Sequence, residues 1–250
     1  MISYAIGTHN ETTEITVLVN LILDHLSDED EIIIVDDYSD DPETIRIIGE
    51  YEEKGIKVYK HRLAGDFAQH KNFMISKCTQ PYIFNIDADE LPHEALLINI
   101  KDVIELNENV DLFYIPRINT VEGITIRHIT NWNWNVSKLG EEIFGEMKKK
   151  VKKSELKDNM MVIKTCGLFI SETDDEIEYH VPIINPPDIQ GRLFKNKPNI
   201  RWEKPVHERI VGSLKPTVFP MTEEFCLYHM KKIKKQESQN EQYDEILENI

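Results

Sequence analysis

The chain has 250 residues, and its 29 lysines and arginines against 45 aspartates and glutamates give a formal net charge of −16 at pH 7. A nucleic-acid-binding protein needs a basic face to displace counterions from phosphates, so this balance argues against a nucleic-acid partner. With 40% hydrophobic and 30% charged residues the composition is that of a globular protein, and the length fits one α/β domain.

Short apolar runs alternate with segments of helical period along the first half of the chain. The predicted strands cover residues 2–7, 32–35, 57–59 and 82–86, and the predicted helices cover residues 14–26, 42–55 and 67–78. Thr12 or Thr13 is expected to cap the first helix. Strands and helices in turn form βαβ units, which build a parallel sheet.

The second half is less regular. It holds a predicted strand over 111–116, a two-residue period that would place Trp132 and Trp134 on one face of a strand, and a polar C-terminal helix over 230–250. A basic run at 148–153 and an acidic run at 172–178 are interpreted as solvated faces. No linker divides the chain, so a single domain over 1–250 is expected.

Cysteine usage and hydropathy predict the compartment. Cys78, Cys166 and Cys226 are far apart and odd in number, which excludes a disulfide framework and a CxxC site. The sequence opens without the basic and apolar regions of a signal peptide, and no run approaches the ~20 apolar residues that span a bilayer. We therefore expect a cytoplasmic protein with no transmembrane segment.

Polar residues follow three predicted strands at the point where each strand ends. They form the segments Thr8-His9-Asn10-Glu11, Asp36-Asp37-Tyr38-Ser39 and Asp87-Ala88-Asp89-Glu90. Ligands of open α/β sheets bind beyond the carboxyl ends of the strands, where the loops converge and helix N-termini present free N–H groups. This edge of the sheet is the predicted binding site.

Asp87 and Asp89 place two carboxylates on one turn, an arrangement that can hold Mg²⁺ or Mn²⁺ together with phosphate oxygens. The alternative is a turn that only caps the helix beginning near Pro92. An apolar strand does not ordinarily end in three acids unless a cation offsets their repulsion, and this favours a metal site.

Several established motifs are missing. No GxGxxG follows a strand, and neither GxxxxGK[ST] nor GxSxG is present. His207-Glu208 is followed by Arg209, so HExxH is missing too. NAD dehydrogenases, P-loop NTPases, serine hydrolases and zincin metalloproteases are therefore disfavoured.

A family resemblance rests on the order and spacing of five segments across nearly the whole chain. They are Thr8-His9-Asn10-Glu11, Val35-Asp36-Asp37-Tyr38-Ser39-Asp40, Phe67-Ala68-Gln69-His70-Lys71-Asn72, Ile86-Asp87-Ala88-Asp89-Glu90 and Trp202-Glu203-Lys204-Pro205-Val206-His207-Glu208. Together they resemble the family 2 glycosyltransferases, which are nucleotide-sugar enzymes of the GT-A fold. Arg192-Leu193-Phe194-Lys195-Asn196 is similar to a segment of the lipopolysaccharide-core glucosyltransferase branch.

The resemblance implies an α/β, GT-A architecture. Its central sheet would be Rossmann-like and mostly parallel, with flanking helices and a mixed acceptor-side half. Residues 1–116 would form the nucleotide-sugar half, 117–229 the acceptor and catalytic half, and 230–250 the C-terminal helix.

For the donor, the resemblance implies that Asp37 accepts a hydrogen bond from the nucleobase and that Thr8, Asn10 and Glu11 line the base and ribose. The alternatives are local: the aspartates could form the turn before the second helix, and Asn10 could cap the first. Lys71 would face the diphosphate, although it replaces the arginine usual in the family and lacks its bidentate fork. The alternative for Lys71 is a solvent-facing lysine.

For the metal, the resemblance implies Mn²⁺ or Mg²⁺ bound by Asp89, with Asp87 holding the ribose or a metal-bound water. His229 lies where many GT-A enzymes carry a C-terminal metal ligand, and imidazole suits Mn²⁺. A structural histidine is the alternative.

For catalysis, inverting transfer needs a base that takes the proton of the acceptor hydroxyl. The resemblance assigns this role to Glu208 within Val206-His207-Glu208, beside His207. The alternative is a buried His207–Glu208 pair linked by hydrogen bonds.

The remaining candidates concern the acceptor and the diphosphate. The indoles of Trp132, Trp134 and Trp202 could stack on sugar rings, or could equally belong to the core. Arg192 could neutralise the diphosphate, or could stay solvated on a surface strand.

Together these expectations describe a metal-dependent, inverting glycosyltransferase that moves a sugar from a UDP-linked donor to a carbohydrate or glycolipid acceptor. Residues 148–153 or 231–235 could reach a membrane surface. The rivals are a non-catalytic nucleotide-sugar or glycan-binding protein of the same fold and a sugar nucleotidyltransferase. The retained acidic residues argue against the first, and the missing glycine-rich basic loop argues against the second.

Overall fold

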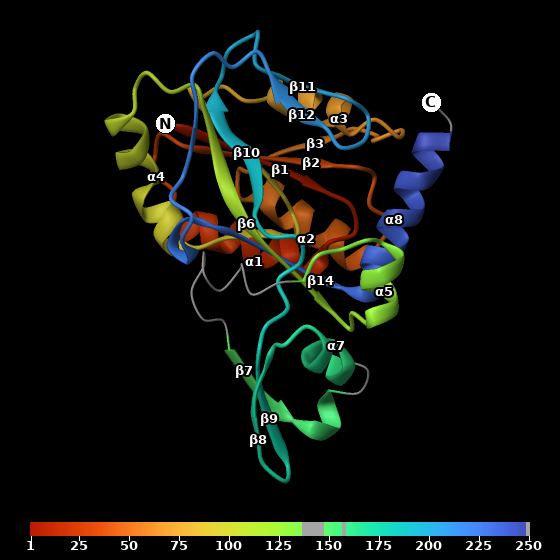
Figure 1. Cartoon of the computed structure of the whole chain (residues 1–250). Coiled ribbons are helices and arrows are strands. Elements are labelled where there is room, and N and C mark those ends of the chain that lie inside the picture. Colours follow the sequence, from red (N-terminus) through yellow and green to blue (C-terminus); the bar gives the residue numbers. More distant parts are fainter. Residues whose placement is uncertain (137–147, 157–158, 249–250) are drawn as a thin grey trace.

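A computed structural model describes residues 1–136, 148–156 and 159–248 (Figure 1). The helices are α1 (Thr12–His25), α2 (Pro42–Glu53), α3 (Phe67–Ile75), α4 (Glu94–Leu106), α5 (Ile126–Asn131), α7 (Asn159–Thr165) and α8 (Ile233–Glu248). The strands are β1 (Ile2–Thr8), β2 (Glu31–Asp36), β3 (Lys57–Lys60), β4 (Tyr82–Asp87), β5 (Glu90–Pro92), β6 (Leu112–Glu122), β7 (Lys148–Lys152), β8 (Phe169–Glu172), β9 (Glu176–His180), β10 (Asp188–Lys195), β11 (Arg201–Glu203), β12 (Arg209–Val211), β13 (Pro216–Val218) and β14 (Leu227–Lys232).

One mostly parallel sheet forms the centre of the main part of the described fold. Its strand order is β3-β2-β1-β4-β10-β6-β14-β5, and β13 also pairs with β6. β10 is antiparallel to both of its neighbours, whereas β1, β2, β3 and β4 all run parallel. The predicted α/β architecture is thus confirmed. The predicted division after residue 116 falls inside β6, and strands from both halves complete the same sheet.

Helices cover the two faces of this sheet. Alternation along β1 sends Ile2, Tyr4 and Ile6 into a large core with α1, α2 and α4. Ala5 points to the other face, where Met74 of α3 packs. Because the strands are buried on both faces, they read as continuous apolar runs, and this is why the sequence predicted them well.

A small lobe lies apart from the main sheet, at the bottom of Figure 1. Its strands β7, β9 and β8 pack with α7 around a core of their own. The basic and acidic runs of the sequence meet here, because Lys150 bonds Glu176 at 2.7 Å and Lys153 lies 3.3 Å from Glu172. These ion pairs reduce the positive charge that residues 148–153 could offer to a membrane.

The structure corrects three local predictions. Residues 131–135 do not form a strand: α5 ends at Asn131, and Asn133 is left-handed with φ = 51°. Neither Thr12 nor Thr13 caps α1, because Glu11 is the N-cap residue and the Thr12 hydroxyl donates to Asp41 instead. The final helix begins at Ile233, and residues 227–232 form β14.

Two further predictions concern the extent of the C-terminal helix and the absence of a transmembrane segment. Positions 249–250 of the predicted helix lie outside the described residues. No helix in the described part of the chain is both long and apolar enough to cross a bilayer.

Glu31 joins the amino-terminal ends of the first strands. Its carboxylate accepts hydrogen bonds from Ser3 Oγ at 2.5 Å, Lys57 Nζ at 2.5 Å and Thr79 N at 2.6 Å. Burial alone would raise the pKa of Glu31, but these donors outweigh it and lower the pKa from 4.5 to about 2. The ionised carboxylate is therefore part of what aligns β1, β2 and the segment before β4.

Replacing Glu31 with glutamine should destabilise the fold by about 2 kcal/mol at pH 7. A lowered folded-state pKa stabilises above the unfolded value, near 4.3, and the stabilisation disappears as the pH falls toward 2. In urea unfolding, the difference between wild type and Glu31→Gln should therefore shrink by about half at pH 3. Glu29→Gln, at an exposed position, is the control. An equal loss at both pH values would contradict this account.

Candidate active site

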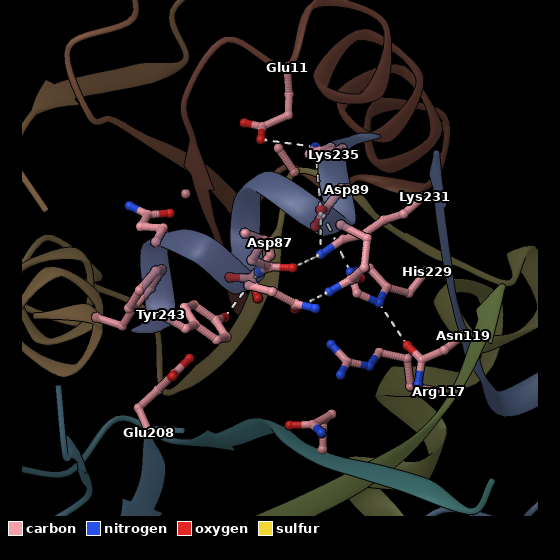
Figure 2. A pocket seen from close by; sticks show the side chains of 18 of the residues that line it. Glu11, Asp87, Asp89, Arg117, Asn119, Glu208, His229, Lys231, Lys235 and Tyr243 are labelled. Atoms are coloured by element: carbon pink, nitrogen blue, oxygen red, sulfur yellow. Dashed lines mark hydrogen bonds and ion pairs between the residues drawn. The ribbon is translucent and has the colours of Figure 1, made fainter. Parts of the chain in front are cut away.

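A cavity of about 870 Å³ opens at the carboxyl ends of β1 and β4. Its other walls come from α3, β6, β10, β14, the segment at 207–208 and one face of α8 (Figure 2). Strands β1 and β4 are neighbours, with Gly7 and Asp87 in register. The edge predicted from the polar clusters is therefore where the cavity lies.

Of the four residues predicted to line the base and ribose through the first two loops, three line the cavity: Thr8, Glu11 and Asp37. The Thr8 hydroxyl donates to Glu11 at 3.0 Å, and Asp37 accepts a bond from Leu63 N at 2.9 Å. Asn10 does not line it. The Asn10 amide oxygen accepts from the backbone N–H groups of residues 40 and 41, both at 3.0 Å, so in this structure Asn10 joins two loops.

Lys71 links two acids across the cavity. Its Nζ lies 2.6 Å from Glu208 Oε1 and 3.3 Å from Asp87. Lys71 is 4% exposed, so the solvent-facing alternative is wrong. Burial alone would raise the pKa of Glu208, but Lys71 outweighs it and holds that pKa below its usual range. The chain thus keeps Glu208 ionised at neutral pH.

Arg192 is 2% exposed, so it is not a solvated surface arginine. Its Nη2 donates to Asp87 at 2.9 Å and to Glu90 at 2.6 Å. Burial alone would raise the pKa of Asp87, but the charges of Lys71 and Arg192 hold it well below its usual range.

Glu90 and Arg117, neither of which was a predicted site residue, complete this ion network. Glu90 is 1% exposed, accepts from Arg117 Nη1 at 2.7 Å, and also accepts from the backbone N–H of Asp87 at 3.2 Å. Arg117 Nε also donates to Asp188 at 2.7 Å. A lone arginine within an apolar strand was the one available signal for Arg117.

Asp89 faces a different group of cations on β14 and α8. Its Oδ2 lies 3.4 Å from both Lys231 Nζ and Lys235 Nζ, and 3.6 Å from His229 Nε2 (Figure 2). Burial alone would raise the pKa of Asp89, but these surroundings hold it well below its usual range. The idea that residues 231–235 reach a membrane is wrong for Lys231 and Lys235, which face the cavity instead.

A chain of hydrogen bonds orients His229. Asp188 accepts from Asn119 Nδ2 at 2.6 Å, which turns the Asn119 oxygen toward His229 Nδ1 at 2.7 Å. Nδ1 is then the donor, and burial lowers the pKa of His229, so the neutral ring directs its Nε2 lone pair toward Asp89. Metal-binding histidines are commonly held through their other ring nitrogen in this way.

The donor set fits a divalent cation chemically. The carboxylates of Asp87 and Asp89 and the Nε2 of His229 are ligands that Mn²⁺ accepts. Within the described ranges, however, no three histidine, cysteine, aspartate or glutamate side chains already form a metal-sized cluster. Ammonium groups lie against Asp89 instead.

The three tryptophans predicted to contact an acceptor differ in their position relative to the cavity. Trp202 is 4% exposed and lies beneath Lys71, whose Nζ is 4.6 Å from the ring centroid, so the prediction that Trp202 contacts an acceptor disagrees with its burial. Trp134 lines the cavity, and Trp132 packs on it with ring centroids 4.7 Å apart.

His207 and Glu208 do not form a buried pair. His207 is exposed and left-handed, with φ = 53°, and its ring lies edge-on to Tyr243 of α8 with centroids 5.6 Å apart. Glu208 turns the other way, toward Lys71. Tyr243 was not a predicted site residue, yet it faces the cavity from a polar helix.

Comparison with known proteins shows the family of the chain. The profile described as "Glycosyl transferase family 2" matches residues 3–177. The chain belongs to glycosyl transferase family 2. Among curated protein sequences, none matches the chain.

Solved structures give the fold of this family 2 chain. The crystal structure of S. aureus TarS 1–349 superposes with a TM-score of 0.52 at 15% identity, over 92% of this chain and 60% of that one. The same TarS fragment in complex with UDP gives a TM-score of 0.51 at 16% identity, with the same coverage. The chain therefore spans about three fifths of the length of these structures. The prediction of a GT-A fold is confirmed.

Replacing Glu90 with glutamine should cost about 3–5 kcal/mol of stability, because the buried guanidinium of Arg192 and the half-buried one of Arg117 lose their shared carboxylate. Chemical unfolding followed by circular dichroism measures this loss. Glu105→Gln, on the exposed side of α4, should change stability little. A Glu90→Gln variant as stable as Glu105→Gln would show that the network does not depend on Glu90.

Proposed function

We propose that the chain is an inverting glycosyltransferase that transfers a sugar from a nucleoside-diphosphate sugar to a hydroxyl acceptor. The observation that carries the proposal is one cavity that holds the donor-loop residues, the Asp87–Asp89 turn and Glu208 together. A non-catalytic binding protein would have no need for an ionised carboxylate opposite that turn.

Glu208 is the base in this proposal. Lys71 holds Oε1, so the other oxygen, Oε2, takes the proton from the acceptor hydroxyl. The acceptor oxygen then bonds to the anomeric carbon on the face opposite the leaving group. The bond from that carbon to the phosphate oxygen breaks, and its electron pair leaves with the nucleoside diphosphate. One displacement of this kind inverts the anomeric configuration.

Asp89, His229 and Asp87 would hold Mn²⁺ or Mg²⁺, once the ammonium groups beside Asp89 move aside. A bound divalent ion would supply positive charge for the departing diphosphate. Asn119 and Asp188 keep the His229 ring turned toward Asp89.

The proposal also includes the nucleotide of the donor and the chemical class of the acceptor. We assign UDP as the nucleotide, in keeping with the UDP complex of S. aureus TarS. The acceptor would be a carbohydrate or a glycolipid, as in the lipopolysaccharide-core branch that the Arg192–Asn196 segment resembles. A cytoplasmic location remains a prediction from cysteine usage.

Replacing Glu208 with glutamine should lower turnover by roughly 10²–10⁴-fold, because glutamine cannot accept the proton. Release of UDP from UDP-sugars in the presence of a panel of carbohydrate acceptors measures turnover. UDP should still raise the melting temperature of the variant, because the base does not bind the nucleotide. Turnover near that of wild type would remove Glu208 from the role, and a wild type that transfers no sugar and binds no nucleotide would refute the proposed function.

Replacing His229 with alanine should weaken Mn²⁺ binding by at least about ten-fold, since one ligand is lost. Titration of free Mn²⁺ by electron paramagnetic resonance gives the affinity directly, with no need for turnover. His25→Ala on α1 is the matched control. An unchanged affinity in His229→Ala would assign the histidine a structural role.

A further inference from the structure

Two lysines from different elements approach the same carboxylate. Lys231, on β14, is 6% exposed and donates to Gln239 Oε1 at 2.6 Å. Lys235, in the first turn of α8, donates to Glu11 at 3.1 Å. Each Nζ also lies 3.4 Å from Asp89 Oδ2, and the two side chains converge there in Figure 2.

This arrangement changes when the proposed metal is bound. A cation on Asp89 competes with both ammonium groups for the same oxygen, and a buried ammonium is costly unless it is paired. Lys231, whose other partner is the neutral amide of Gln239, then needs another anion, whereas Lys235 keeps only Glu11 and has donors free for a second anion. Arg192 lines the same cavity, and its buried Nε has no hydrogen-bond partner among the described residues. The cavity therefore contains cationic hydrogen-bond donors that are available to an anionic ligand.

The position of the pair indicates which anion this is. Thr8 and Asp37 line the part of the cavity beyond β1 and β2, while Asp89 follows the neighbouring strand β4. A nucleotide whose nucleoside lies at the first two loops would extend its phosphates toward Asp89. Ammonium groups are compact charges that bind phosphate oxygens well.

We propose that Lys231 and Lys235 are a diphosphate-binding pair that exchanges Asp89 for the phosphate oxygens of the nucleotide. This inference rests on the proposed function. Lys231 is fixed by the pairing of β14 with β6, whereas Lys235 is carried by α8, so nucleotide binding ties the helix to the sheet. When the bond to the sugar breaks, the pair neutralises charge that has moved onto the diphosphate.

The test compares UDP with uridine, which lacks the phosphates. Calorimetry in the presence of Mn²⁺ should show that Lys235→Met weakens UDP binding about ten-fold or more and leaves uridine binding unchanged. Lys235→Arg, which keeps the charge, should restore most of the affinity. Lys234→Met is the matched control, because Lys234 is exposed on the same helix and does not line the cavity.

Lys231→Met should behave as Lys235→Met does, and if this buried replacement fails to fold, Lys235→Met decides alone. An equal loss for uridine and UDP, or an equal loss in Lys234→Met, would overturn the pair while leaving the proposed function intact. If the wild type binds GDP or CDP instead, the same comparison is made with guanosine or cytidine. A wild type that binds none of the three diphosphates would refute the proposed function and, with it, this inference.

Discussion

The neutralisation of acids at the end of a buried strand is the constraint on which the site depends. β4 runs through the core and ends at Asp87, and Asp89 and Glu90 follow in the next turn. Such carboxylates are unfavourable in a protein interior unless cations face them. For Asp87 and Glu90, Arg192 from β10, Arg117 from β6 and Lys71 from α3 meet that need, so three elements far apart in the sequence are held around one turn.

Much of the first half could be predicted from the sequence because its signals are local. The strands at 2–7 and 82–86 are apolar runs, and the polar residues that follow them reach the cavity through a general property of parallel sheets. The partners of those residues could not be found in the same way. Arg192 and Asp87 are 105 positions apart, and no local pattern states that they pair.

The errors in the second half also have physical causes. The alternation around Trp132 is compatible with a strand, but Thr125 and His128 form a capping box that begins a short helix just before it. Asn10 illustrates a different limit. Its residue type suits a ribose contact and a loop contact equally well, and only the fold shows that its amide is used by residues 40 and 41.

The cavity is lined on one side by α8, whose only contribution to a hydrophobic cluster, among the described residues, is the partly buried Ile233 at its start. None of the described residues of α8 is buried, and its contacts with the rest of the chain include ion pairs and ring edges such as that between Tyr243 and His207. Segments held in this way open locally at a smaller free energy than the whole domain needs to unfold. The two sides of the cavity thus differ in how they are held: the acidic turn continues a buried core strand, whereas the wall formed by α8 has no buried residue among those described.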